Sequence, residues 1–422
     1  MNNELVNGKK FTFLKKMTSN EDVLGIYGKM ATLGDRKKKS KDRLKPLLDF
    51  TIEKFSLLPV RICLFYVFCQ YSFATFLTFY HLLETFDPQE LLKHGSFCGI
   101  QIFIQMNLWT VIFLSEEFNL FLRRYADNMI PIEMLNRKTF DKVLLAVRIL
   151  KLIAAIDMAL AIIASAGFIA APEYFDERTY LCVWIEKTFP NHKKFMLEVV
   201  HWTSLPVALI LAGCSVGFAY YSCTSIFQIL VIHELITSIS NSALPQELRR
   251  DSKLYQEAVK QKLVISIMAH ECTVRFQSIA SDLLEIPMML LAVGSTILGG
   301  SLMIEFLRGQ DYDIGDHFEV YIGILCFIIA GVISANTYLI IGQAIKDVSQ
   351  GCYDKLCELP WYDMNRENKQ IYSIFLFRSQ KNLAISNSLV QIDYVLLVKI
   401  VKSLYSLAAV LTRFVSSNGE AE

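Results

Sequence analysis

Charged residues are scarce in this sequence. Only 20% of its 422 residues are Asp, Glu, Lys or Arg, whereas 53% are hydrophobic and the mean hydropathy is +0.36. A disordered chain or a collagen-like fibre is excluded, because neither contains so many apolar residues. The net charge of +1 gives no indication of a nucleic-acid partner, and we expect none. The composition is typical of a membrane protein.

The sequence also lacks the motifs that organise disulfides, metals and phosphates. Its ten cysteines form no CxxC pair, and no phosphate-binding loop is present. His233 and His270 each begin the zinc pattern HExxH, but Thr237 and Val274 stand where the second histidine is required. We therefore expect no disulfide framework, no metal site, no cofactor and no enzymatic activity.

The other five histidines are expected near the ends of membrane spans or in loops. Solvated or helix-capping roles are usual at such positions, and we predict them here. These residues are His81, His94, His192, His201 and His317.

Long apolar runs recur along the whole chain. About 20 residues are needed for a helix to cross the roughly 30 Å of hydrocarbon in a bilayer. The segments that meet this requirement are Leu57–Leu83, Phe97–Leu120, Val143–Ala171, Phe195–Ile236, Ile286–Phe306, Phe318–Ile345 and Ile392–Thr412. We therefore predict an all-α membrane protein with seven transmembrane helices. Internal repeats and inverted halves are not evident, which argues against a secondary transporter.

Positive charges are distributed unevenly between the connecting segments. Most of the 42 Lys and Arg residues lie in the N-terminal segment and in the second, fourth and sixth loops. Because cytoplasmic loops are enriched in both residues, we predict a cytoplasmic N-terminus and an extracellular C-terminus. The densest basic run, from Arg36 to Lys45, suits two roles: a cytoplasmic flank that fixes the topology, or a site for anionic membrane lipid.

The spans and loops divide the chain into five parts. Helical patterns continue beyond the bilayer over about 237–285 and over 346–391, and we expect them to form a cytoplasmic anchor bundle. Pro206 is expected to kink the fourth span, and Pro360 with Trp361 to interrupt the chain before the last cytoplasmic helix. The predicted parts are a cytoplasmic N-terminal segment (1–56), a six-span bundle with its cytoplasmic extension (57–345), anchor helices (346–391), a pore-lining seventh span (392–412) and an extracellular tail (413–422).

Few charged residues lie inside the predicted spans, and each is a candidate for function. Asp157 in the third span suits either a structural polar contact or a ligand or ion site. Lys399 and Lys402 lie three residues apart in the last span, on adjoining parts of one helix surface. They either snorkel to the membrane surface, meet a neighbouring subunit or border water. The polarity of this helix is typical of a pore lining.

Several short motifs follow one another in the last part of the chain. They are YLIIGQ at 338–343, Ser349, Tyr353, Trp361-Tyr362, FRSQK at 377–381 and IVKSLYS at 400–406. Their order and spacing resemble the signature of insect odorant receptors. The seven-span layout with a cytoplasmic N-terminus is compatible with that family over the rest of the chain.

The resemblance implies an odorant-gated, nonselective cation channel in the plasma membrane of a sensory neuron dendrite. In that family four subunits surround a central pore lined by the seventh span, and each subunit holds an odorant pocket in the outer half of its helix bundle. Most members are ligand-tuning subunits that form heterotetramers with a shared co-receptor. This chain resembles a tuning subunit, because its loop between the fourth and fifth spans is short where the co-receptor carries a long insertion.

A pocket for a small volatile molecule needs aromatic and aliphatic walls with one or two polar groups. The candidates in the outer halves of the spans are Gln101, Ile104, Gln105, Ala161, Ser165, Phe168, Val199, Trp202, Leu205, Tyr321 and Leu325. The alternative for each of them is ordinary packing between helices.

For the gate, one face of the last span repeats apolar residues. Leu404, Ala408 and Leu411 recur on this face with Thr412 beside them, and Val410 is the alternative if the helix is rotated. A ring of such side chains from four subunits would block ions by dewetting. The other possibility is that this face packs against the fifth or sixth span.

Three other functions are weighed against the odorant-gated channel. The Thr-Tyr and Gln-Phe motif of gustatory receptors is not found in the last span, so a gustatory-receptor-like channel is only a near alternative. A seven-span receptor that signals through a cytoplasmic partner fits the span number, but the N-inside orientation and the absence of Asp-Arg-Tyr and Asn-Pro-x-x-Tyr argue against a G-protein-coupled receptor. An intramembrane hydrolase is the least supported, since neither a metal motif nor a nucleophile with its base is found.

Overall fold

The computed structural model describes residues 57–86, 88–127, 135–240, 249–308, 318–386 and 390–419. Within these ranges the chain is helical, and the only β-type pairing is an isolated antiparallel bridge between Ser386 and Gln391. The prediction of an all-α protein is therefore confirmed.

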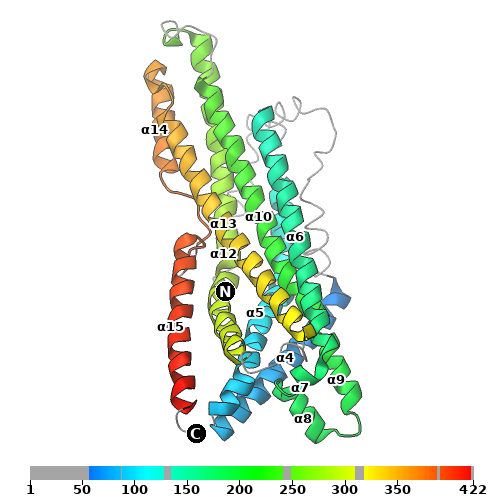
Figure 1. The fold of residues 1–422 in the computed structure, drawn as a ribbon. Helices are drawn as coiled ribbons and strands as arrows, with labels where there is room; N and C mark the ends of the chain where they lie inside the picture. The colour runs from blue at the N-terminus through cyan, green and yellow to red at the C-terminus, as the bar shows by residue number, and fades with distance from the viewer. Residues whose placement is uncertain are drawn as a thin grey trace, which may run out of the picture. The chain divides into compact units, whose positions relative to one another are not determined.

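Eleven α-helices and one 3-10 helix follow one another in the described residues (Figure 1). They are α4 (Leu58–Thr85), α5 (Pro88–Asp127), α6 (Arg137–Ala170), α7 (Pro172–Asp176), α8 (Tyr180–Thr188), α9 (Lys193–Trp202), α10 (Ser204–Ser240), α12 (Lys253–Arg308), α13 (Phe318–Cys357), η3 (Trp361–Asp363), α14 (Arg366–Ser379) and α15 (Tyr394–Gly419).

Six helical segments of the described chain are long and apolar enough to cross a membrane. They lie in α4, α5, α6, the α9–α10 pair, α12 and α13, and each overlaps one of the first six predicted spans over nearly its whole length. The predicted seventh span lies in α15, a 26-residue helix that is not among these six. The side of the membrane on which each terminus lies stays a prediction.

Helix α10 lies at the centre of the packing. It contacts α5, α6, α12 and α13, and none of its residues is exposed. Tyr220 and Tyr221 are 1% and 0% exposed. A helix that is apolar all round is stable only when it is covered on every face, and the four neighbours of α10 supply that cover.

The fourth predicted span is divided in two at Thr203. Pro206 was expected to kink this span in its middle, but it lies in the first turn of α10, directly after the break. The proline ring clashes with the carbonyl of the residue four positions earlier, which is Trp202, so α9 ends there. The Thr203 amide donates a shared hydrogen bond, 3.3 Å long, to each of the carbonyls of Val199 and Val200.

One end of the bundle is a cluster of apolar residues from α10, α12, α13 and α14. Ile236, Leu263, Leu356 and Phe375 lie at its centre, and each is at most 1% exposed. The cytoplasmic helical pattern predicted over about 237–285 runs from residue 253 onward into the fifth predicted span as one continuous helix, α12, which contains Pro287. The predicted interruption at Pro360 and Trp361 is confirmed, because η3 begins at Trp361 after α13 has ended.

Hydrogen bonds made by the Gln256 side chain, as donor and as acceptor, join this cluster to the start of α14. The Gln256 amide donates to the carbonyl of Asp363 over 2.8 Å, and its side-chain oxygen accepts from the backbone N–H of Asn365 over 2.9 Å. The side-chain amide of Asn368 donates to the same oxygen over 2.8 Å. Buried hydrogen bonds between separate elements favour one arrangement of the surrounding helices.

Gly342 lets the segment before α15 lie directly against α13. A Cβ atom on Gly342 would overlap the backbone carbonyl oxygen of Ile392 and would lie 2.8 Å from the Ile392 side chain. Since backbone cannot move aside as a flexible side chain can, only glycine fits here. The glycine of the YLIIGQ motif therefore sets where the chain enters α15.

We predict that Gly342→Ala destabilises the protein by about 1–3 kcal/mol, because the added methyl group overpacks a backbone contact. The matched control is Gly331→Ala on the same helix, where an added Cβ meets nothing within 4 Å. That change should be neutral or stabilise by up to about 1 kcal/mol, since Ala is the better helix former. Thermal unfolding of the purified full-length protein in detergent measures both. Equal melting temperatures for the two variants would contradict the role assigned to Gly342.

Candidate ligand-binding site

A cavity of about 650 Å³ lies among the helices. Its walls come from α5, α6, α10, α12 and α13, with further residues from α4, from the α7–α8 segment and from α15. Most of the side chains that line it are aliphatic or aromatic. Its volume is in the range of pockets that bury small organic ligands.

Helical spacing explains how α6 and α10 present their residues to this cavity. On α6, Asp157, Ala161, Ser165 and Phe168 recur at intervals of four, four and three residues, so they share one face. On α10, Ser204, Val207, Ala208 and Leu211 also share one face, because they lie three or four residues apart around it. The hydroxyls of Ser165 and Ser204 are 2.8 Å apart and place a polar pair in the apolar wall.

Five of the predicted pocket residues line the cavity and six do not. Those that line it are Gln101, Ile104, Ala161, Ser165 and Phe168. Those that do not are Gln105, Val199, Trp202, Leu205, Tyr321 and Leu325. Contact of any of them with a ligand stays a prediction.

Several of the six residues that do not line the cavity have side chains directed elsewhere. The amide of Gln105 is turned to α4, where it donates to the Tyr71 carbonyl over 3.0 Å and to the Thr75 hydroxyl. Trp202 and Leu325 are 61% and 56% exposed, on the outside of the bundle. In the fourth span the cavity wall is formed by Val200, Ser204 and Ala208, which recur every four residues on one face, and Val199 and Leu205 lie off that face.

Sequence reasoning missed the contributions of α12 and the α7–α8 segment, and on α13 it chose residues that do not line the cavity. Leu298 and Leu302 on α12 and Phe327 on α13 line the cavity, but an apolar residue in an apolar helix has no feature that distinguishes a cavity wall from a lipid-facing surface. Phe175 and Leu181 also line it, from a stretch with too few apolar residues for a span. The apolar run at 180–185 is the one signal that this segment folds back onto the bundle.

Asp157 forms a polar contact between three helices. One of its carboxyl oxygens accepts hydrogen bonds from Ser215 on α10 over 3.0 Å and from Ser334 on α13 over 2.9 Å. Its other oxygen has no hydrogen-bond partner among the described residues, and the side chain is 2% exposed. Of the two roles considered for Asp157 from the sequence, the structural polar contact is therefore observed.

Among the described residues, the rest of the chain covers α15 on one face only. Leu404 lies on this face, because a Cβ on Gly299 of α12 would lie 2.5 Å from it. Val410 is 62% exposed, and Lys399 and Lys402 are exposed as well. The side chains of Ala408, Leu411 and Thr412 lie outside the described residues, and the assignment of all these residues to a gate stays a prediction.

Two of the histidines expected to be solvated are buried. His94 is 2% exposed and His201 is 5% exposed, because residues of the α7–α8 segment cover both. His192 is exposed, in agreement with the prediction, and His317 lies outside the described residues. The α7–α8 segment was expected to be a loop, and its packing onto the helix ends is what buries these side chains.

Comparisons with known proteins agree on one family. The sequence profile of the family described as 7tm Odorant receptor matches residues 102–405. The fold is similar to the insect olfactory receptor OR5 from Machilis hrabei in complex with eugenol, with a TM-score of 0.58 and 9% identity over 81% of this chain and 88% of that chain. It is also similar to the structure of OR5 from Machilis hrabei described without eugenol, with a TM-score of 0.58 and 11% identity over 82% and 87%. No curated protein sequence matches this chain.

Proposed function

Because this chain belongs to the 7tm odorant receptor family, we propose that it is the odorant-binding subunit of a heteromeric, ligand-gated, nonselective cation channel. The subunit binds a small volatile molecule inside its helix bundle and works with a shared co-receptor in the plasma membrane of a sensory dendrite. The family that matches is that of the odorant receptors, so the gustatory-receptor alternative is set aside.

The observation that carries this proposal is the cavity of about 650 Å³. Its wall is mostly apolar, and the few polar groups include the paired hydroxyls of Ser165 and Ser204. A wall of this kind favours a small apolar ligand with one hydrogen-bonding group, which it distinguishes mainly by shape. Eugenol, which is bound to the similar receptor from Machilis hrabei, has this chemistry and belongs in any first test.

A tuning role is supported by the short connection between α10 and α12. Only 12 residues separate Ser240 from Lys253, where the family's co-receptor has a long insertion. The chain therefore lacks the long insertion of the co-receptor, as expected for a ligand-tuning subunit.

The one-sided packing of α15 supports a pore formed by several subunits. Its exposed surface carries apolar residues together with Lys399 and Lys402, so α15 needs neighbours beyond those that the described part of this chain supplies. Leu404 packs against Gly299 of α12 and faces its own subunit. We therefore place the gate on the exposed face of α15, at Val410, which was the alternative for a rotated helix. A ring that includes Val410 would close the pore by dewetting and open when a ligand favours a wider arrangement of α15.

The first test is whole-cell current in cells that express this chain with and without an insect co-receptor. A panel of volatile esters, alcohols and phenols, with eugenol among them, is applied under G-protein blockade. We expect fast inward current only when both chains are present. Second-messenger signalling without current would contradict the channel and favour the seven-span receptor that signals through a cytoplasmic partner.

We predict that Ala161→Phe raises the half-maximal odorant concentration at least tenfold, because the larger ring occupies the cavity. Ile162→Phe is the matched control, since Ile162 is the next residue on α6, is 41% exposed and does not line the cavity. Dose–response curves with the co-receptor present measure both, after surface labelling has shown equal delivery. An unchanged response from Ala161→Phe would remove the cavity as the odorant site.

Val410→Cys tests the pore surface. A membrane-impermeant thiol reagent applied during odorant stimulation should reduce the current of this variant by more than half, because a modified side chain obstructs the pore. Val401→Cys is the control, since Val401 is also exposed but lies on the opposite side of α15. Block of Val401→Cys with no effect on Val410→Cys would place the pore on the other face.

A further inference from the structure

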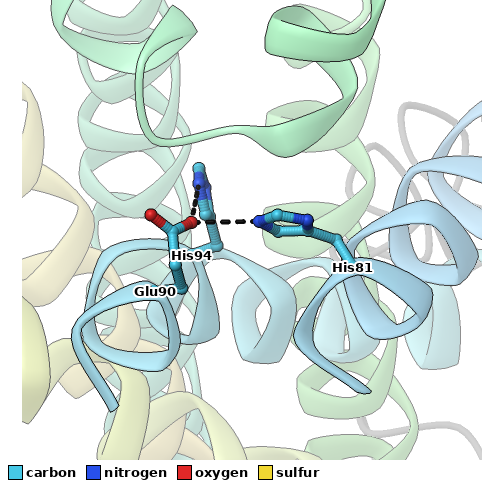
Figure 2. Close-up of side chains that lie close together, drawn as sticks. All are labelled: His81, Glu90 and His94. Atoms are coloured by element: carbon cyan, nitrogen blue, oxygen red, sulfur yellow. Dashed lines mark hydrogen bonds and ion pairs between the residues drawn. The ribbon is translucent and has the colours of Figure 1, made fainter. Parts of the chain in front are cut away.

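Three potential metal ligands converge where α4 and α5 meet (Figure 2). The Nε2 atom of His81 lies 3.0 Å from Oε2 of Glu90, and the Nε2 atom of His94 lies 3.3 Å from the same oxygen. Helix α4 ends at Thr85, and Phe86 has a left-handed backbone conformation with a φ of 46°. The chain then enters α5, whose first turns bring Glu90 and His94 to the last turns of α4.

The hydrogen bonding of His94 fixes which of its nitrogens carries a proton. Its Nδ1 atom lies 2.8 Å from the backbone carbonyl oxygen of Arg178. A carbonyl oxygen only accepts hydrogen bonds, so Nδ1 carries the proton and Nε2 of the neutral ring presents a lone pair to Glu90. A lone pair and a carboxylate oxygen 3.3 Å apart repel each other unless a cation or a second proton lies between them. The hydrogen bond from His81 holds the pKa of the Glu90 carboxyl below its usual range, so the carboxylate is anionic.

The spacing of the three ligand atoms suits a tetrahedral transition-metal ion. Zinc binds imidazole nitrogen and carboxylate oxygen at about 2.0–2.2 Å, which places tetrahedral ligands about 3.3 Å apart. The distances of 3.0 Å and 3.3 Å to the Glu90 oxygen are close to this value. All three ligand atoms lie within 4.8 Å of one another, and the ring nitrogen of His81 that faces Glu90 binds an ion when its proton is on the other nitrogen.

The surroundings hold the ligands in position. The hydrogen bond from His94 to the Arg178 carbonyl is the kind of outer contact that orients most metal-binding histidines. The His81 ring is stacked on Tyr180 with centroids 4.1 Å apart, and the His94 ring meets the edge of Tyr180 at 5.6 Å. The Glu90 side chain is 31% exposed, which leaves a route for an ion from solvent.

We propose that His81, Glu90 and His94 form a binding site for a divalent transition-metal ion of the zinc type, with water as the fourth ligand. Two imidazoles and one carboxylate favour Zn²⁺ over Mg²⁺ and Ca²⁺, which prefer sites made of oxygen atoms. The bound ion joins α4 and α5 directly and holds the α7–α8 segment through Arg178 and Tyr180. It is bound outside the cavity, and the proposal does not depend on odorant binding.

The proposed metal site is connected to the cavity wall through Tyr180. Thr179 and Leu181 line the cavity, and Tyr180 between them is stacked on His81. An ion that fixes Tyr180 therefore fixes part of the cavity wall. We expect bound Zn²⁺ to alter the response to odorants without competing for the same space.

A second group of potential ligands, Asp176, Cys182 and His201, is less suited to a metal ion. Nε2 of His201 is 2.9 Å from the Asp176 carboxylate, and a single proton on that nitrogen satisfies both atoms. Cys182 is 1% exposed, and burial raises the pKa of its thiol. This group has no lone pair directed at an anion, and it provides a control for the first.

The test is Zn²⁺ binding to the purified, tag-free full-length protein, measured by competition with a fluorescent zinc indicator. His81→Ala and His94→Ala should each weaken binding at least tenfold, and Glu90→Gln should weaken it as well. His192→Ala, which removes an exposed histidine, and His201→Ala should bind Zn²⁺ as the unmodified protein does. Mg²⁺ and Ca²⁺ should not displace the bound ion.

A second measurement separates loss of binding from loss of folding. Saturating Zn²⁺ should raise the melting temperature of the unmodified protein and of His192→Ala, but not that of His81→Ala. If His94→Ala unfolds because the residue is buried, His81→Ala and Glu90→Gln carry the test. No measurable Zn²⁺ binding, binding unchanged by all three ligand variants, or binding lost only in His201→Ala would each overturn the proposal.

Discussion

The burial of α10 on every side is the constraint on which the rest of the structure depends. No residue of this 37-residue helix is exposed, and its apolar residues follow no single face. Such a helix has no stable surface orientation, so other helices must cover it completely. The helices α5, α6, α12 and α13 do so, and their mutual positions are set by what fits around α10. The polar contact from Asp157 to Ser215 and Ser334 then selects one rotation of α6 and α13 around it.

The segment that contains α7 and α8 adds a cover to the cavity in this arrangement. An uninterrupted helix through Pro206 would lose a backbone hydrogen bond and would place the proline ring against the Trp202 carbonyl. The helix is interrupted at Thr203 instead, where α9 has ended and α10 begins at Ser204. Residues Phe175, Thr179 and Leu181 of the preceding segment then reach the cavity wall. The same segment supplies the Arg178 carbonyl that orients His94, so it contacts both the cavity wall and the cluster of His81, Glu90 and His94.

Hydropathy predicted the spans well because a bilayer requires a fixed length of apolar helix, and that length is visible in any sequence. The cavity was predicted only in part, since a lining residue such as Phe327 and a lipid-facing residue such as Leu325 are both apolar and differ only in the rotation of α13. Polar lining residues were easier to predict. Gln101 and Ser165 line the cavity as expected, whereas the side chain of Gln105 is turned to α4. His81, Glu90 and His94 could not be grouped from sequence, because the turn at Phe86 decides whether the two helices bring them together.

The surface of α15 gives the strongest physical argument for an assembly. A lysine within a membrane helix costs about 2.5–3.5 kcal/mol at the bilayer centre, and Lys399 and Lys402 are both exposed on this helix. Exposed apolar residues such as Val398 and Val410 lie on the same helix, so neither lipid nor water alone suits its whole surface. The proposed channel would resolve this conflict, because part of the helix would then meet neighbouring subunits and part would border an aqueous pore. Leu404 and Gly299 would keep α15 attached to its own subunit, so that a change in the cavity lined by both residues is transmitted to the proposed pore.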